Sequence, residues 1–182
     1  MMTYELLVDN FHRHLKACYF DVTEDASYLI LKENKGKQYQ VKLNISRDTS
    51  KFVIIKDLED LKNNDAGYSK EPPKDCDYII IDWIKKEVLF IELKDTDETN
   101  AALMAQLIAG EKWLAHLLFC TRNLLPDFTQ KKVAIRYDKD VPLGRRGRRA
   151  GRNGQGANQL KEVSGGELFV LRGNEFNIDQ IR

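Results

Sequence analysis

Two adjacent runs of large apolar residues constrain the fold of this chain more than any other feature. Residues 76–82 read CDYIIID, residues 87–95 read EVLFIELKD, and the four residues WIKK join them. Runs of this density are typical of buried strands, and so short a connection joins antiparallel neighbours. The two runs therefore predict a hairpin within a buried sheet.

The remaining residues supply strands and helices that would surround this hairpin. Apolar residues recur at helical spacing over 3–18 and, most strongly, over 100–120. Further β-rich runs occupy residues 28–32, 39–45, 51–57, 131–138 and 166–171, of which the first two predict a hairpin. Residues 58–75 predict a surface loop that starts with a helical turn. This order of elements predicts an α/β fold with a central mixed β-sheet flanked by helices.

Length and composition are those of one soluble globular domain. The chain has 182 residues, of which 42% are hydrophobic and 31% charged, so it can bury a core without disulfides or structural metal. No apolar run approaches the roughly 18 residues of a membrane helix, and no secretory signal is visible at the N-terminus. Cys18, Cys76 and Cys120 lack metal-binding spacing. We therefore expect one cytoplasmic domain over residues 1–182, without a membrane partner.

Positive charge is concentrated in one glycine-rich segment. Residues 131–152 hold nine Lys and Arg residues against two Asp residues, a local charge of +7, whereas the whole chain carries +1. Residues 144–156 have too few apolar side chains to pack, so we expect a flexible basic Arg/Gly loop there. Guanidinium groups suit phosphate binding, although a solvated loop without a ligand is the alternative. The candidate phosphate contacts are Arg145, Arg146, Arg148, Arg149 and Arg152.

Glu92 and Lys94 are charged residues in an otherwise apolar strand. Alternation places them on the same face as Phe90, and burying either charge without a partner would cost several kcal/mol. Counting outward from the turn places Asp77, at the start of the preceding strand, roughly opposite them. Two carboxylates and a lysine therefore converge at one end of the sheet. A simple ion pair between Glu92 and Lys94 is the alternative.

Such a group of side chains suits metal-assisted hydrolysis of a phosphodiester. Asp77 and Glu92 would hold Mg²⁺ or Mn²⁺, with the backbone carbonyl of Leu93 as a further ligand. Lys94 would orient or deprotonate the attacking water and offset negative charge in the transition state. The residues therefore favour a metal-dependent nuclease.

The same residues resemble the PD-(D/E)xK nuclease superfamily, which includes many restriction enzymes. Cys76-Asp77 falls on the family's Pro-Asp position, and residues 92–94 fall on its acidic-x-Lys triplet. Cys76 replaces the proline, but the aspartate would be the metal ligand. The likeness is best over about residues 52–118 and looser elsewhere. It implies a restriction-endonuclease-like fold and hydrolysis of nucleic acid, with DNA favoured over RNA, in host defence or DNA processing.

The resemblance implies two further site residues. Gln106, twelve residues after Lys94 on the next helix, falls where many members carry a glutamine that faces the active site. Glu5, on the first helix, would be the additional acidic residue that some members provide. The other acids near the hairpin, Asp75 and Asp82, are predicted to be solvated carboxylates.

Functions without catalysis stay open. The same fold with an idle site would serve as a nucleic-acid-binding or structural subunit, or as a protein-interaction factor whose basic loop contacts an acidic protein. A chain this small rarely cuts both strands of DNA alone. We therefore expect a homodimer or a larger complex.

Overall fold

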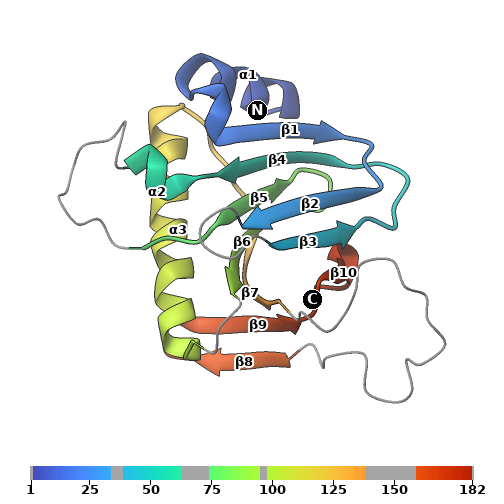
Figure 1. Ribbon diagram of the computed structural model, residues 1–182. Helices are drawn as coiled ribbons and strands as arrows, with labels where there is room; N and C mark the ends of the chain where they lie inside the picture. The colour runs from blue at the N-terminus through green and yellow to red at the C-terminus, as the bar shows by residue number, and fades with distance from the viewer. Residues whose placement is uncertain (1, 34–38, 63–73, 95–97, 138–158, 182) are drawn as a thin grey trace.

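A seven-stranded mixed sheet forms the middle layer of the computed structural model, which describes residues 2–33, 39–62, 74–94, 98–137 and 159–181 (Figure 1). In sheet order the strands are β1 (Phe20–Glu24), β4 (Lys51–Lys56), β5 (Tyr78–Asp82), β6 (Glu87–Lys94), β7 (Thr129–Arg136), β9 (Gly166–Arg172) and β8 (Gln159–Val163). Strands β6, β7 and β9 are parallel, and the other neighbouring pairs are antiparallel.

Strands β5 and β6 form the predicted hairpin at the centre of this sheet. The register pairs Tyr78 with Ile91 and Asp82 with Glu87, and the apolar side chains between these pairs are buried. Lys86 has a φ of 56°, a left-handed conformation that helps the chain reverse between the strands. The isoleucine-rich sequence lacks polar alternation because other layers cover both faces of the hairpin.

A second, three-stranded sheet covers one face of the large sheet. Its strands, in order, are β10 (Glu175–Asn177), β3 (Tyr39–Asn44) and β2 (Tyr28–Glu33). Leu31 and Leu43 of this sheet share a core with Ile80 of β5. The Tyr78 hydroxyl donates to the Lys32 carbonyl at 2.7 Å, which ties the two sheets together. The predicted hairpin of residues 28–45 is therefore confirmed, but it belongs to a separate layer.

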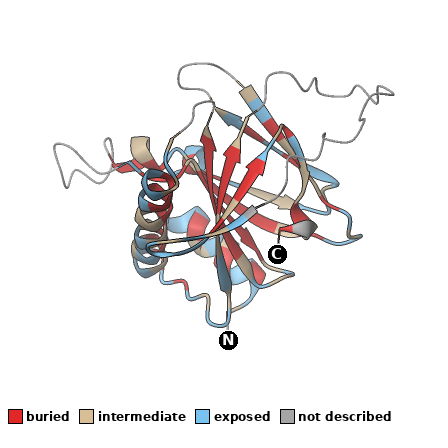
Figure 2. Ribbon diagram, turned by 90° about the horizontal axis from the view of Figure 1, so that it is seen from below, coloured by how far each residue is buried: buried red, intermediate tan, exposed pale blue. Residues whose placement is uncertain are grey.

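Helices cover the opposite face of the large sheet. They are α1 (Tyr4–His14), α2 (Leu58–Leu61) and α3 (Asn100–Cys120), together with the short 3₁₀ helix η1 (Ala17–Tyr19). A second 3₁₀ helix, η3 (Ile178–Gln180), follows β10 and packs with the small sheet instead. Leu7 of α1 and Leu107 of α3 share a core with Phe90 of β6. Figure 2 shows the buried residues gathered along the central strands. The predicted α/β architecture, with a mixed central sheet and flanking helices, is confirmed.

Each long helix begins at a threonine cap. Thr3 Oγ1 accepts a hydrogen bond from the Leu6 N–H at 3.2 Å, and Thr99 Oγ1 accepts one from the Ala102 N–H at 3.3 Å. Among the helices that the structure describes, none has the length and apolarity required to cross a membrane.

Three strands, β1, β8 and β10, lie outside the predicted β-rich runs. Their sequences, FDVTE, QLKEV and EFN, contain few apolar residues. Strands β1 and β8 are the edges of the large sheet, and β10 is an edge of the small sheet. Edge strands are short and often polar, so they give a weak sequence signal.

Gly110 lets α3 approach the start of β5 more closely than a residue with a side chain would. A methyl group at this position would overlap Cys76 Sγ, which is buried beneath the helix. Alanine favours a helix over glycine by about 1 kcal/mol. Nevertheless, we expect Gly110→Ala to lower the free energy of unfolding by about 1–3 kcal/mol, measured by urea denaturation, because of this overlap.

The control is the same substitution in a Cys76→Ala protein, from which the sulfur has been removed. In that protein Gly110→Ala is expected to be neutral or to raise the free energy of unfolding. Equal destabilisation in both backgrounds would show that the Gly110–Cys76 contact is not the cause.

Candidate active site

Glu92 and Lys94 lie next to each other on β6, on the face that α3 covers. Lys94 Nζ is 2.8 Å from Glu92 Oε1, and only 2% of the Glu92 side chain is exposed against 20% for Lys94. Phe90, two residues before Glu92, belongs to the core beneath the helix. The alternation of the strand thus directs both charges toward the helix layer.

Asp77 lies directly opposite this pair. Tyr78 is in register with Ile91, so extension of the ladder by one residue places Asp77 opposite Glu92. Asp77 Oδ2 accepts a hydrogen bond from the Leu93 N–H at 2.7 Å. In a strand the N–H and C=O of one residue point to the same side, so the Leu93 carbonyl is also directed toward β5. The structure thus brings Asp77, Glu92, Lys94 and the Leu93 backbone together.

Gln106 joins this group through Glu98, a residue that sequence reasoning missed. Gln106 Nε2 donates to Glu98 Oε2 at 3.4 Å, and Glu98 Oε1 is 3.6 Å from Lys94 Nζ. The available signal was the spacing, because Glu98 follows Lys94 by four residues and immediately precedes the Thr99 cap of α3. The residue before the helix cap therefore places an acidic side chain beside the end of β6.

Two buried oxygen atoms in the cluster lack a hydrogen-bond partner within the described part of the chain. They are Glu92 Oε2 and Gln106 Oε1. Buried oxygens are almost always bonded in proteins, so each of these atoms has an unused capacity to accept a hydrogen bond or to bind a cation.

Burial and charge shift the titration of both members of the β6 pair. Burial, with the negative charge of Asp77 added to it, raises the pKa of Glu92 to about 8, although Lys94 acts in the opposite direction. Burial alone would lower the pKa of Lys94, but the hydrogen bond and charge of Glu92 outweigh it and raise that pKa. Lys94 therefore stays an ammonium group, while Glu92 resists ionisation unless additional positive charge arrives.

The described residues contain no group of three or more His, Cys, Asp or Glu side chains arranged to hold a metal ion. Asp77 and Glu92 supply two carboxylates, and the Leu93 carbonyl is an oxygen ligand of a different kind. Mg²⁺ is commonly bound by one or two carboxylates while it keeps several waters. The unbonded Glu92 oxygen and the adjacent Asp77 carboxylate fit such an ion.

Glu5 does not join this cluster. Its Oε1 is 3.2 Å from the Nζ of Lys51, the first residue of β4. The other end of β4 is the one beside the site, because its last residue, Lys56, is in register with Tyr78. Five residues of strand, about 17 Å, separate the two ends. The predicted phosphate contacts Arg145, Arg146, Arg148, Arg149 and Arg152 lie outside the described residues.

The prediction that Asp75 and Asp82 are solvated is wrong. Asp75 forms an ion pair with Lys62 in which the two side chains are 1% and 2% exposed. Burial raises the pKa of Asp75 despite this partner. Asp82 pairs with Arg47, and its Oδ1 accepts a hydrogen bond from the Lys85 N–H at 3.0 Å. Both carboxylates are buried because tertiary packing brings a cation to each.

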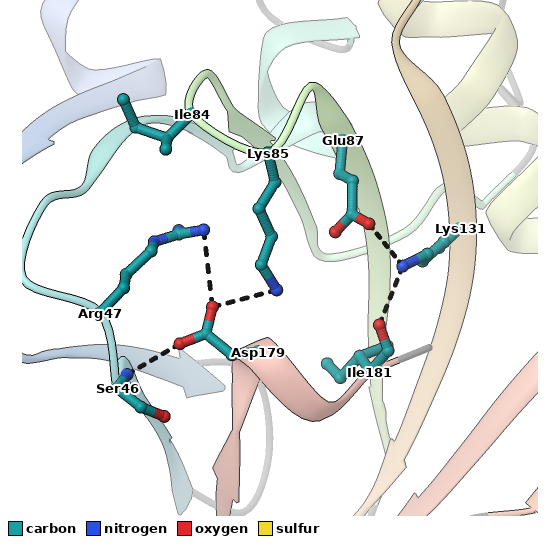
Figure 3. Close-up of a pocket in the computed structure, with 8 residues that line it drawn as sticks. All are labelled: Ser46, Arg47, Ile84, Lys85, Glu87, Lys131, Asp179 and Ile181. Atoms are coloured by element: carbon teal, nitrogen blue, oxygen red, sulfur yellow. Dashed lines mark hydrogen bonds and ion pairs between the residues drawn. The ribbon is translucent and has the colours of Figure 1, made fainter.

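A pocket of about 560 Å³ lies at the end of the sheet opposite the cluster (Figure 3). Asp179 Oδ1 in this pocket is 3.0 Å from Lys85 Nζ and 3.5 Å from Arg47 Nη1. Lys131 Nζ is 2.7 Å from Glu87 Oε1 and donates to the Ile181 carbonyl at 2.9 Å. The cations of this pocket are therefore already balanced by carboxylates.

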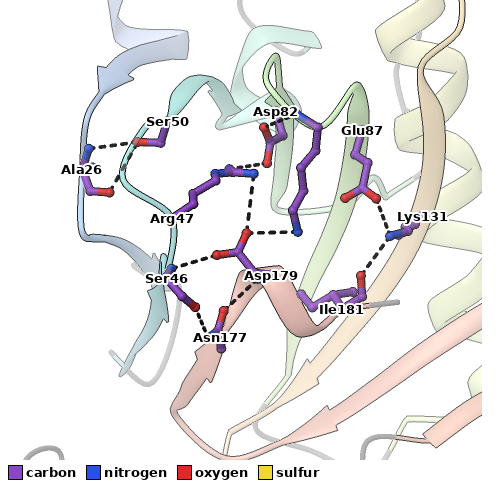
Figure 4. A network of polar contacts seen from close by, with 11 residues as sticks. Ala26, Ser46, Arg47, Ser50, Asp82, Glu87, Lys131, Asn177, Asp179 and Ile181 are labelled. Atoms are coloured by element: carbon purple, nitrogen blue, oxygen red, sulfur yellow. Dashed lines mark hydrogen bonds and ion pairs between the residues drawn. The ribbon is translucent and has the colours of Figure 1, made fainter.

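The contacts of the pocket belong to a wider polar network (Figure 4). The Ser46 N–H donates to Asp179 Oδ2 at 2.8 Å. Burial opposes ionisation of Asp179, but this hydrogen bond and the charges of Lys85 and Arg47 outweigh it and lower the pKa of the carboxyl. The network thus ties η3 to the β3–β4 connection and to the ends of the central strands, which is a structural role.

A second hollow, of about 370 Å³, adjoins Asp77 on the side of β4 and α2. Its charged lining consists of Lys32 and the acids Glu33, Asp57, Glu59, Asp60, Asp75 and Asp77. This side of the site therefore has an excess of negative charge, which the Lys62 partner of Asp75 offsets only in part.

The chain was compared with protein-family models, with curated proteins and with solved structures. None of the three comparisons finds a match.

Proposed function

We propose that this protein is a metal-dependent nuclease of the PD-(D/E)xK type, with a restriction-endonuclease-like fold. The observation that carries the proposal is the state of the Glu92 carboxylate. One of its oxygens contacts Lys94, and the other is buried without a hydrogen-bond partner among the described residues. Asp77 lies opposite it and raises its pKa further. A divalent cation would use the unbonded oxygen.

Each residue of the cluster has a role in this proposal. Asp77, Glu92 and the Leu93 carbonyl would hold Mg²⁺ or Mn²⁺. When bound, the ion supplies positive charge that polarises a phosphodiester. Lys94, held as an ammonium group, donates hydrogen bonds to the attacking water or a phosphate oxygen and offsets negative charge. Gln106 offers its unbonded Oε1 to a water.

Glu98 completes this arrangement as a positioning residue. Its two carboxylate oxygens face different partners, Lys94 at 3.6 Å and the Gln106 amide at 3.4 Å. It thereby links the end of β6 to the first turns of α3. Its position holds the Lys94 ammonium group between two carboxylates, those of Glu92 and Glu98.

The biological setting belongs to the same proposal. The substrate is nucleic acid, with DNA favoured, and the role is host defence or DNA processing in the cytoplasm. A homodimer or a larger complex would bring two such sites to a duplex.

A second candidate function is a subunit that keeps the fold without catalysis. The observation in its favour is the closed contact between Lys94 and Glu92, together with the lack of a three-ligand acidic group among the described residues. In that case the cluster would stabilise the end of the sheet, and the protein would bind nucleic acid or another protein.

The deciding experiment is incubation of the purified protein with supercoiled plasmid, single-stranded DNA and RNA in Mg²⁺ or Mn²⁺. We expect cleavage that EDTA abolishes and that Lys94→Ala reduces by about 100-fold or more, because the variant loses a charge at the reacting phosphate. Lys112→Ala, which removes an exposed lysine from the middle of α3, is the matched control and should cleave normally.

The opposite outcome is equally clear. If the wild-type protein and Lys94→Ala leave all three substrates equally intact, the nuclease proposal fails and the non-catalytic subunit becomes the better description.

A further inference from the structure

Three cations stand side by side at the carboxyl ends of the parallel strands. Lys94 of β6 is in register with Arg136 of β7, and Arg136 is in register with Arg172 of β9. Neighbouring strands are about 4.8 Å apart, so the row spans about 10 Å from β6 to β9. Figure 1 shows these strands following one another in the sheet.

All three cations lie on the face that the helices cover. Phe90, Ala134 and Val170, which precede them by an even number of residues on their strands, belong to the core beneath α3. Arg136 Nη2 donates to the Glu98 carbonyl at 2.7 Å, immediately before the cap of α3. The positive end of this 21-residue helix therefore lies beside the row and adds to its potential.

Arg172 is the member of the row whose charge is available to a ligand. Lys94 is engaged by Glu92 and Glu98, and Arg136 holds the start of α3. Arg172 is exposed, and within the described part of the chain it has no ion-pair partner. A guanidinium group in this position can form a bidentate contact with a phosphate.

The other side of the cluster has the opposite charge. The acidic hollow beside β4 and α2 includes Asp57, Glu59 and Asp60 in its lining. A polyanion would be repelled there and attracted to the side of β7 and β9. Charge thus changes sign across the sheet, with the Asp77–Glu92 pair at the boundary.

We infer that a nucleic-acid strand approaches the Asp77–Glu92 site over the carboxyl ends of β7 and β9, where Arg172 binds a backbone phosphate and Arg136 supports it. This inference rests on the proposed function and adds the direction of approach and the phosphate-binding residues. The acidic hollow beside Asp77 stays outside the path of the strand.

Fluorescence anisotropy tests this inference without cleavage. A fluorescein-labelled single-stranded DNA is titrated with protein in EDTA at salt concentrations from about 25 to 200 mM. We expect Arg172→Gln to weaken binding about tenfold at low salt and to reduce the log–log salt slope by about 0.7, because one phosphate contact is lost.

Two control variants make the test specific. Lys112→Gln removes an exposed positive charge from the middle of α3, away from the row, and is expected to bind within about twofold of wild type. Glu59→Gln removes a negative charge from the acidic hollow, and because no strand lies there, it should not weaken binding. Circular dichroism confirms that each variant is folded.

The outcomes separate this inference from the proposed function. Equal binding by wild type and Arg172→Gln, or no binding by wild type at low salt, overturns the inference. If Arg172-dependent binding is found but no substrate is cut in Mg²⁺ or Mn²⁺, the inference stands and the nuclease proposal fails. If nucleic acid is cut but Arg172→Gln has no effect on binding, the nuclease proposal stands and the inference about Arg172 fails.

Discussion

Replacing Glu92 with glutamine is expected to reduce nucleic-acid cleavage by about 1000-fold while stabilising the protein at alkaline pH. The loss of cleavage corresponds to about 4 kcal/mol and follows from the role proposed for Glu92, in which its carboxylate would hold the metal ion. Plasmid cleavage in Mn²⁺ measures it. A residue that only stabilised the fold would show the opposite effect on stability, so the combination identifies a functional group.

The expected pH dependence follows from the raised pKa. Glu92 titrates at about 8 in the folded chain, against about 4.3 in the unfolded chain. Between these values the folded state holds a proton that the unfolded state has lost. The stability associated with this proton is fully present below about pH 4.3 and is lost as the pH rises through 8. Glutamine carries no charge, so the variant avoids this loss.

Urea denaturation in EDTA checks the prediction. The advantage of Glu92→Gln over wild type should be small near pH 5 and on the order of a few kcal/mol near pH 9. Glu111→Gln is the control, because Glu111 also pairs with a lysine, Lys132 at 3.0 Å, but is 39% exposed. Its effect on the free energy of unfolding is expected to be small, because an exposed ion pair contributes little. A Glu92→Gln protein that is equally destabilised at both pH values would show that the carboxylate serves the fold.

Lys62→Met is expected to lower the free energy of unfolding by about 3–5 kcal/mol. The Lys62 and Asp75 side chains are almost completely buried, so removal of the lysine leaves a charge in the interior. Asp75 would respond by protonation, which burial already favours. The loss should therefore be larger at pH 8 than at pH 5, measured by urea denaturation.

The double variant Lys62→Met/Asp75→Leu separates the charge from the packing. It removes both partners, so it is expected to recover most of the lost stability, as apolar replacements of buried ion pairs often do. A double variant that is as unstable as Lys62→Met would indicate that the shape of the lysine, beside Trp113, matters more than the ion pair.

Part of the site could be predicted because short-range rules determine it. The connection between β5 and β6 is short, so a count outward from the turn places Asp77 opposite Glu92 without knowledge of the rest of the fold. Strand alternation then places Lys94 on the same face. Apolar density likewise identifies the central hairpin and α3, since these elements are buried whatever their neighbours are.

Other features depend on contacts between distant parts of the chain. Asp82 is paired with Arg47, 35 residues away, and Asp75 is paired with Lys62, so local polarity gave the wrong expectation for both carboxylates. Glu5 lies in the first turn of α1, where it forms an ion pair with Lys51 instead of joining the cluster. The separate three-stranded sheet is hidden for the same reason, because periodicity reveals strands but not the layer to which they belong.

The neighbouring strands β9 and β10 belong to different sheets, and this has a consequence during synthesis. β9 pairs with β7 in the large sheet, while β10, three residues later, pairs with β3 in the small one. Until residues 166–177 leave the ribosome, β7 and β3 each expose an open edge. The nascent chain therefore carries two unpaired strand edges, which favour chaperone binding or association with a second chain.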